Sequence, residues 1–96
     1  MIEESYKSLK YFISMSKKSL PIEALEAIMH YFEHDEFELC FEGLVIELIN
    51  NQSYPERFNF LEWKKVALEY QLDKESAFDG YFWGRFTKWG ESYPCK

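Results

Sequence analysis

Apolar residues recur every three or four positions along most of the chain, and this spacing restricts the fold more than any other feature. One face of an α-helix has this period, whereas a half-buried strand alternates at every second residue. Strict alternation never extends beyond a few residues. A chain of 96 residues has room for one hydrophobic core. We therefore expect a single all-α domain over residues 1–96, a small bundle of four to five short helices.

The first three helices are predicted from apolar spacing and from residues that begin or end helices. The first begins near Ile2 and is ended by the lysine pair at 17–18, and the second extends from about Pro21 to His34. The third extends from Glu36 to about Ile49. Asp35 is predicted to cap this third helix, because Asp35-Glu36-Phe37-Glu38 has the D-x-x-E form of a capping box.

Two further helices are predicted after the polar loop at 50–55. Asn59 is expected to cap the fourth helix, and Asp73 is expected to open the last. The side chains expected on the buried face of the fourth helix are Trp63, Val66, Ala67 and Tyr70. Those expected on the buried face of the last helix are Phe78, Phe82, Phe86 and Trp89.

The negative charge of the chain is concentrated in its central third. The whole chain has a net charge of −6, but residues 21–50 contain eight acids and no Lys or Arg, a net of −8. A concentrated acidic surface attracts a basic partner, whereas binding to nucleic acid depends on Lys and Arg that neutralise phosphates. We therefore expect a basic protein partner and no nucleic acid. The alternative is a solvated helix face whose acids pair with Lys7, Lys10, Lys64 and Lys65.

The densest group of acids lies where the second predicted helix turns into the third. Glu38 and Glu42 are four residues apart on one helix face, where like charges repel by a few tenths of a kcal/mol. Aromatic side chains beside charge commonly anchor protein interfaces. The predicted partner-binding residues are Glu33, Asp35, Glu36, Glu38 and Glu42, together with the aromatic residues Tyr31 and Phe37.

The segment from His30 to His34 matches H-x-x-E-H, the inverted zinc-protease pattern. On a helix the two histidines share a face and could bind Zn²⁺, with Glu33 as a base. A working site would also need a third protein ligand, such as Glu38 or Glu42, and a substrate cleft. We interpret the pair as solvated histidines at a helix end, and we predict no catalytic residue, no metal ligand, no cofactor and no enzyme. A small metal-dependent hydrolase is the alternative.

The two cysteines, Cys40 and Cys95, fit neither a disulfide framework nor a CxxC metal site. Cys40 falls on an apolar helix face, where we expect a buried structural thiol. No apolar run approaches the roughly 18–20 residues that span a bilayer. The first ten residues have no apolar segment of the kind found in secretory signals. We expect a cytoplasmic protein that does not insert into a membrane.

Residues 22–72 resemble the centre of small helical bacterial immunity proteins, which accompany toxins of contact-dependent growth inhibition and related polymorphic toxin systems. The similar features are a helix ending near an acidic corner, an E-x-E-L-like start at 36–39, an acidic and apolar end at 47–49, and a loop followed by the helix with Trp63. Cys40 and Phe41 stand where small residues are common in such proteins.

The resemblance implies an immunity protein that binds a toxin domain, often a basic nuclease, and blocks its active site or its access to substrate. An acidic face would then meet the basic groove in which the nuclease holds RNA or DNA. Such a protein acts in the cytoplasm of the producing cell, needs no cofactor and performs no chemistry. The alternative function is that of an acidic adaptor or regulator which binds another basic protein.

Overall fold

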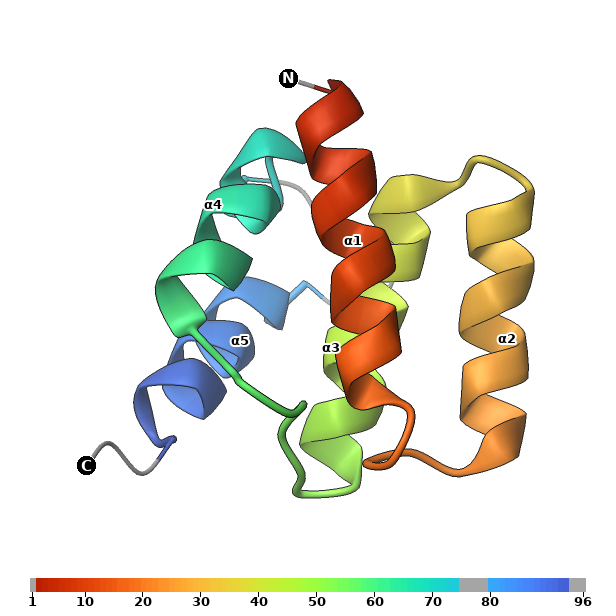
Figure 1. Cartoon of the computed structure of the whole chain (residues 1–96). Coiled ribbons are helices and arrows are strands. Elements are labelled where there is room, and N and C mark those ends of the chain that lie inside the picture. The colour runs from red at the N-terminus through yellow and green to blue at the C-terminus, as the bar shows by residue number, and fades with distance from the viewer. Residues whose placement is uncertain (1, 75–79, 94–96) are drawn as a thin grey trace.

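The fold consists of α-helices, as the apolar spacing predicts. The computed structural model describes residues 2–74 and 80–93, and these ranges contain no strand. The all-α fold class is therefore confirmed. The helices are α1 (Ile2–Ser16), α2 (Ile22–Glu33), α3 (Phe37–Asn50), α4 (Phe60–Glu69) and α5 (Phe82–Glu91) (Figure 1).

Helix α3 lies at the centre of the bundle and packs against α1, α2 and α5, while α4 packs against α1 (Figure 1). The composition of α3 explains its position, because apolar residues cover a wide part of its surface and need cover on several sides. Five of its apolar side chains are completely buried, and these are Cys40, Phe41, Leu44, Val45 and Leu48. The central helix thus fixes where the preceding turn and its acidic residues lie.

Stacked and tilted aromatic rings connect the outer helices to this core. Phe12 of α1 stacks on Trp63 of α4 with ring centroids 4.3 Å apart, and Phe41 meets Phe86 of α5 edge to face at 5.9 Å. Tyr54, in the loop before α4, stacks on Trp89 at 5.0 Å and donates a hydrogen bond to the Trp89 carbonyl. Such pairs contribute about 0.5–1.5 kcal/mol each beyond the area that they bury.

The turn between α2 and α3 differs from the predicted capping box. Asp35 adopts a left-handed backbone conformation with φ 59°, and α3 has Glu36 as its N-cap, without a side-chain cap. The N–H of Glu36 donates to the Tyr31 carbonyl and the N–H of Asp35 to the Phe32 carbonyl. These two bonds form a Schellman motif that ends α2. The predicted Asp35 cap is therefore wrong, because the residue is used to end one helix instead of opening the next.

The predicted cap of α4 is confirmed, since the Asn59 side chain accepts a hydrogen bond from the Leu61 N–H at 3.1 Å. The predicted start of the last helix at Asp73 is wrong. Residues 71–74 form a turn in which the Lys74 N–H donates to the Gln71 carbonyl, and α5 begins at Phe82. Phe78 lies outside the described residues. Phe82, Phe86 and Trp89 are buried as predicted, as are Trp63, Val66 and Ala67, whereas Tyr70 is half-buried.

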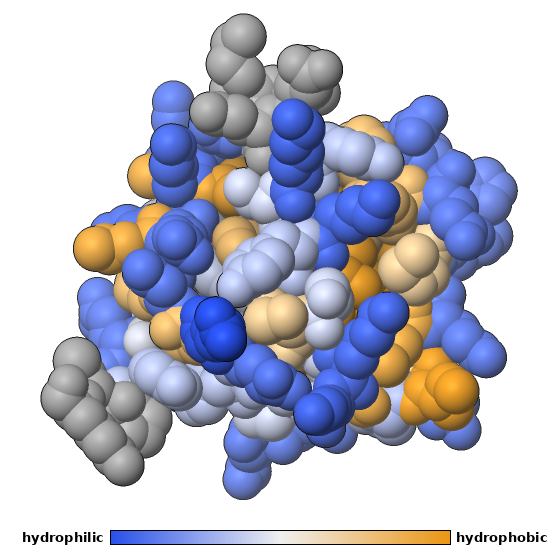
Figure 2. All heavy atoms as spheres, in the orientation of Figure 1, coloured by the Kyte–Doolittle hydropathy of each residue, from blue (hydrophilic) through white to orange (hydrophobic). Residues whose placement is uncertain are grey.

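On the face that α1 presents to the viewer, hydrophilic side chains surround separate hydrophobic patches on the side of α2 and on the side of α4 (Figure 2). Exposed apolar residues include Ile22 at 67% and Leu61 at 74%. Among the described helices, none has both the length and the apolar character needed to cross a membrane.

Candidate protein-binding site

Four carboxylates at the end of α2 and the start of α3 project into solvent, and we call Glu33, Asp35, Glu36 and Glu38 the acidic corner. All four residues are exposed. The tight Schellman turn brings them together, because only three residues, 34–36, separate the two helices. Like charges at this spacing reinforce one another and produce a local negative potential.

No Lys or Arg among the described residues forms an ion pair with the acidic corner. Lys7, Lys10, Lys64 and Lys65 in particular form no ion pair with these four acids. An ion pair found elsewhere joins Lys18 to Glu56 at 3.7 Å.

The acidic corner borders a surface hollow of about 490 Å³, which we call the corner hollow. It lies between the start of α3 and the end of α4. The lining residues combine acids with apolar side chains, and they are Asp35, Glu36, Phe37, Glu38, Leu39, Glu69 and Tyr70. Three of the predicted acids and the predicted Phe37 thus share one hollow with two residues from α4 and its end.

Tyr70 contributes a neutral hydroxyl next to the carboxylates. Burial raises its pKa to about 12, and the nearby Cys40, Glu69 and Glu38 act in the same direction. The Tyr70 hydroxyl oxygen is buried and has no hydrogen-bond partner among the described residues. Its ring lies 6.1 Å from that of Phe41, which connects the corner hollow to the hydrophobic core. The phenol therefore stays protonated over the whole physiological pH range.

Glu69 connects the corner hollow to α1. Its carboxylate accepts a hydrogen bond from the Ser5 hydroxyl. This bond is the main cause that lowers the pKa of Glu69, and the positive charges of the amino terminus and of Lys65 act in the same direction. A carboxylate with a lowered pKa stays ionised at neutral pH. The start of α1 thus helps to hold a fourth negative charge at the hollow.

Three of the predicted binding residues lie outside the corner hollow. Glu33 is exposed at the last position of α2, and Tyr31, two residues earlier, is half-buried. Glu42 is 0% exposed, so the prediction that it shares an exposed acidic face with Glu38 is wrong. The physical reason is its position one turn further along α3, where the neighbouring helices already cover the central helix.

The two histidines of the H-x-x-E-H motif are both exposed at the end of α2. Their ring centroids are 4.3 Å apart, and Nδ1 of His34 donates to the His30 carbonyl at 2.9 Å. Across residues 2–74 and 80–93, no three His, Cys, Asp or Glu side chains are placed to hold a metal ion. Cys40 is fully buried and its thiol pKa is raised to about 12 by burial, so it remains a protonated core residue.

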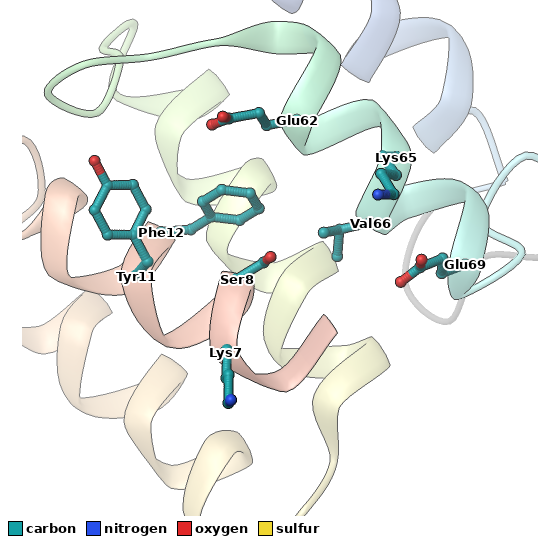
Figure 3. A pocket seen from close by; sticks show the side chains of 8 residues that line it. All are labelled: Lys7, Ser8, Tyr11, Phe12, Glu62, Lys65, Val66 and Glu69. Atoms are coloured by element: carbon teal, nitrogen blue, oxygen red, sulfur yellow. The ribbon is translucent and has the colours of Figure 1, made fainter. Parts of the chain in front are cut away.

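A second hollow, of about 510 Å³, lies between α1 and α4 (Figure 3). Its charged residues are Lys7 and Lys65, which are basic, and Glu62 and Glu69, which are acidic. Because the two signs balance, this hollow does not select a partner of one charge. The corner hollow has no basic lining residue and differs in this respect.

Glu69 and Tyr70 were not among the residues predicted from the sequence. They lie more than thirty positions beyond Glu38, in a segment whose charges balance. They join the site because the end of α4 packs beside the start of α3. No local sequence pattern predicts that contact.

Comparison with known proteins adds no family to this geometry. No protein-family model, curated protein or solved structure matches the chain. The functional proposal therefore depends on the residues of the chain itself.

Proposed function

We propose that the chain is an immunity protein that binds and neutralises a cognate toxin domain, of the nuclease type, through the acidic corner. The observation that carries the proposal is the group of four exposed carboxylates without a Lys or Arg partner among the described residues. The resemblance of residues 22–72 to helical immunity proteins supplies the class of partner. The protein acts in the cytoplasm of the cell that makes the toxin.

Inhibition follows from charge complementarity. A nuclease holds RNA or DNA in a groove lined by Lys and Arg, which neutralise the phosphates. The acidic corner attracts the same basic groove, speeds the encounter and then excludes the nucleic acid by occupying its place. This mechanism requires no chemical step by the chain, so no catalytic residue and no cofactor are needed.

The toxin partner to be tested is chosen from the position of the gene that encodes this chain. Immunity genes lie directly after the toxin that they neutralise, so the C-terminal domain encoded immediately upstream is the partner to test. That domain should arrest growth when it is expressed alone, and co-expression of this chain should restore growth. The two purified proteins should form a stoichiometric complex in size-exclusion chromatography.

Growth arrest that this chain does not relieve, with no complex formed, would contradict the immunity function. A complex with a basic protein that is not toxic would instead support the acidic adaptor or regulator. Zinc-dependent hydrolysis that is lost when His30 and His34 are both changed to Gln would support the metal-dependent hydrolase.

A further inference from the structure

We propose that His30 and His34 form a two-ligand site for a divalent transition metal ion of the Cu²⁺ or Ni²⁺ type. One imidazole nitrogen from each ring binds the ion, and water fills the remaining coordination positions. The sequence alone favours a solvated pair that binds no metal, and the geometry of the two rings is the reason for a different conclusion here. The site performs no catalysis, and the inference does not rest on the proposed function.

The two histidines lie on one exposed face at the end of α2. They are four residues apart, so their side chains are neighbours one helical turn apart. His34 is the C-cap residue, and its backbone N–H still donates to the His30 carbonyl at 3.2 Å, which keeps the helical spacing of the pair. A hydrated metal ion can therefore reach both rings in the folded protein.

The separation of the rings fits a metal that holds its ligands at right angles. The ring centroids are 4.3 Å apart, and the ring planes are inclined by 43°. Two imidazoles bound at right angles, with metal–nitrogen bonds of about 2.0 Å, have ring centroids about 4.4 Å apart. A tetrahedral angle would separate the centroids by about 5.1 Å. The pair thus matches neighbouring positions of a tetragonal ion more closely than those of a tetrahedral one.

The protonation of His34 leaves one of its nitrogens available to a metal. Its Nδ1 lies 2.9 Å from the His30 carbonyl oxygen, which can only accept, so Nδ1 carries the proton of the neutral ring. The lone pair is then on Nε2, and no hydrogen bond within the described ranges engages Nε2 of either histidine. Histidines that bind metals commonly donate their other ring N–H to a carbonyl or carboxylate, which fixes the orientation of the ring.

The surroundings of the pair favour a cation but add no third ligand. Glu26, one turn before His30, and Glu33, next to His34, are exposed acids that make the local potential negative. In the described part of the chain, no third His, Cys, Asp or Glu joins the pair as a ligand. Catalytic zinc sites use three protein ligands, whereas imidazole in tetragonal geometry suits Cu²⁺ and Ni²⁺. The site therefore differs from that of a zinc protease.

The test uses NiCl₂ as the probe, because Ni²⁺ does not oxidise cysteine thiols. Isothermal titration calorimetry on the full chain should show one Ni²⁺ bound per chain, and ZnCl₂ should bind more weakly. In the ¹⁵N-labelled protein, the paramagnetic ion should broaden the amide signals of residues 28–36. His30→Gln and His34→Gln should each weaken Ni²⁺ binding at least about tenfold, because one imidazole alone loses the gain in effective concentration that the second provides.

The matched control is Glu23→His combined with His34→Gln, which keeps two histidines on α2 but places them seven residues apart. That spacing is about 10 Å along the helix, too far for one ion to bind both rings. The control should bind Ni²⁺ as weakly as His34→Gln, and the amide spectrum without metal reports whether each variant is folded. Binding by the control as tight as by the parent, undiminished binding by the single variants, or no broadening near residues 30–34 would overturn the inference.

Discussion

Position 90 leaves no room for a side chain larger than the hydrogen atom of glycine. It is buried in the last turn of α5, and a Cβ at this position would overlap the aromatic ring of Phe60. Gly84 lies in the same helix with open space around it. The two glycines therefore occur in one helix for different reasons, and only Gly90 is required by packing.

We predict that Gly90→Ala lowers the free energy of unfolding by about 1–3 kcal/mol, because Phe60 must leave its position to make room. Gly84→Ala is the matched control and should raise the free energy by up to about 1 kcal/mol, since alanine has the higher helix propensity. Urea denaturation followed by circular dichroism measures both. Equal effects of the two substitutions would show that the contact with Phe60 does not constrain Gly90.

Cys40 makes the stability depend on pH in the alkaline range. Its thiol pKa is raised from 9.0 to about 12 by burial, so between these values the unfolded chain loses a proton that the folded chain keeps. The unfolded state is then favoured as the pH rises. The contribution of the buried thiol to the free energy of unfolding is fully present below pH 9. It is lost as the pH rises toward 12.

We predict that the free energy of unfolding falls between pH 8 and pH 10.5 and that Cys40→Ala makes this fall smaller. Urea denaturation at several pH values measures the slope for each protein. The comparison of slopes removes the cost of the cavity that alanine leaves, because that cost does not depend on pH. Parallel slopes for the two proteins would mean that the Cys40 thiol is not protected by burial.

Helix ends depend on three residues that are not glycine. Asp35, Gln52 and Gln71 all have positive φ, and each follows the end of a helix. In the Schellman motif after α4, the Leu72 N–H donates to the Ala67 carbonyl and the Gln71 N–H to the Leu68 carbonyl. A left-handed conformation costs an L-residue with a side chain about 1–2 kcal/mol. The chain therefore has helix ends that glycine would stabilise.

Gln71→Gly should raise the free energy of unfolding by up to about 1 kcal/mol, the left-handed cost less the backbone entropy that glycine loses. Gln71→Ala removes the same side chain but keeps the Cβ, and it should give no gain. Chemical denaturation of the two variants decides the matter. If alanine stabilised as much as glycine, the backbone conformation at Gln71 would not be the cause.

Apolar spacing predicted both ends of the first three helices and the start of the fourth to within about two residues, because each has a continuous face that neighbours cover. The prediction failed where a helix end depends on a backbone conformation, such as a positive φ or a turn, that the residue type does not specify. Aspartate is a residue type that commonly caps helices, yet Asp35 adopts the left-handed backbone conformation that ends α2. The segment after Asp73 has apolar residues at helical spacing, but residues 71–74 form a turn, and α5 begins at Phe82.

The candidate site was partly predictable for a related reason. Asp35, Glu36, Phe37 and Glu38 are adjacent in the sequence, so their proximity follows from the chain itself. The burial of Glu42 and the approach of Glu69 and Tyr70 depend on packing between distant segments. Such contacts leave no periodic signal in a single sequence.

At the scale of the whole molecule, the important property is the separation of charge. The net of −8 lies on residues 21–50, and the remainder of the chain has a net of +2. A standard interface covers about 800 Å² of each partner, roughly an eighth of the 6332 Å² surface of the chain. The corner hollow would therefore be the centre of a larger contact that includes nearby parts of α2, α3 and α4.

The measurement that tests the central claim most directly is the kinetics of binding to the upstream-encoded toxin domain after charge reversal. The test variant is Glu36→Lys with Glu38→Lys. The control is Glu23→Lys with Glu26→Lys, an equal change of charge on exposed acids of the same acidic third, about 10–15 Å along α2 from its C-terminal end. Both variants should remain within about 0.5 kcal/mol per substitution of the parent in stability, because the residues are exposed.

We expect the Glu36/Glu38 reversal to slow association at least about tenfold and to speed dissociation, since it replaces attraction with repulsion at the contact. The control should change either rate by less than about threefold, because its distance exceeds the screening length of about 8 Å at physiological salt. Binding by the parent protein should weaken as salt is raised. Equal rates for the two reversed variants, or tight binding that salt does not affect, would contradict the acidic corner as the toxin-binding site.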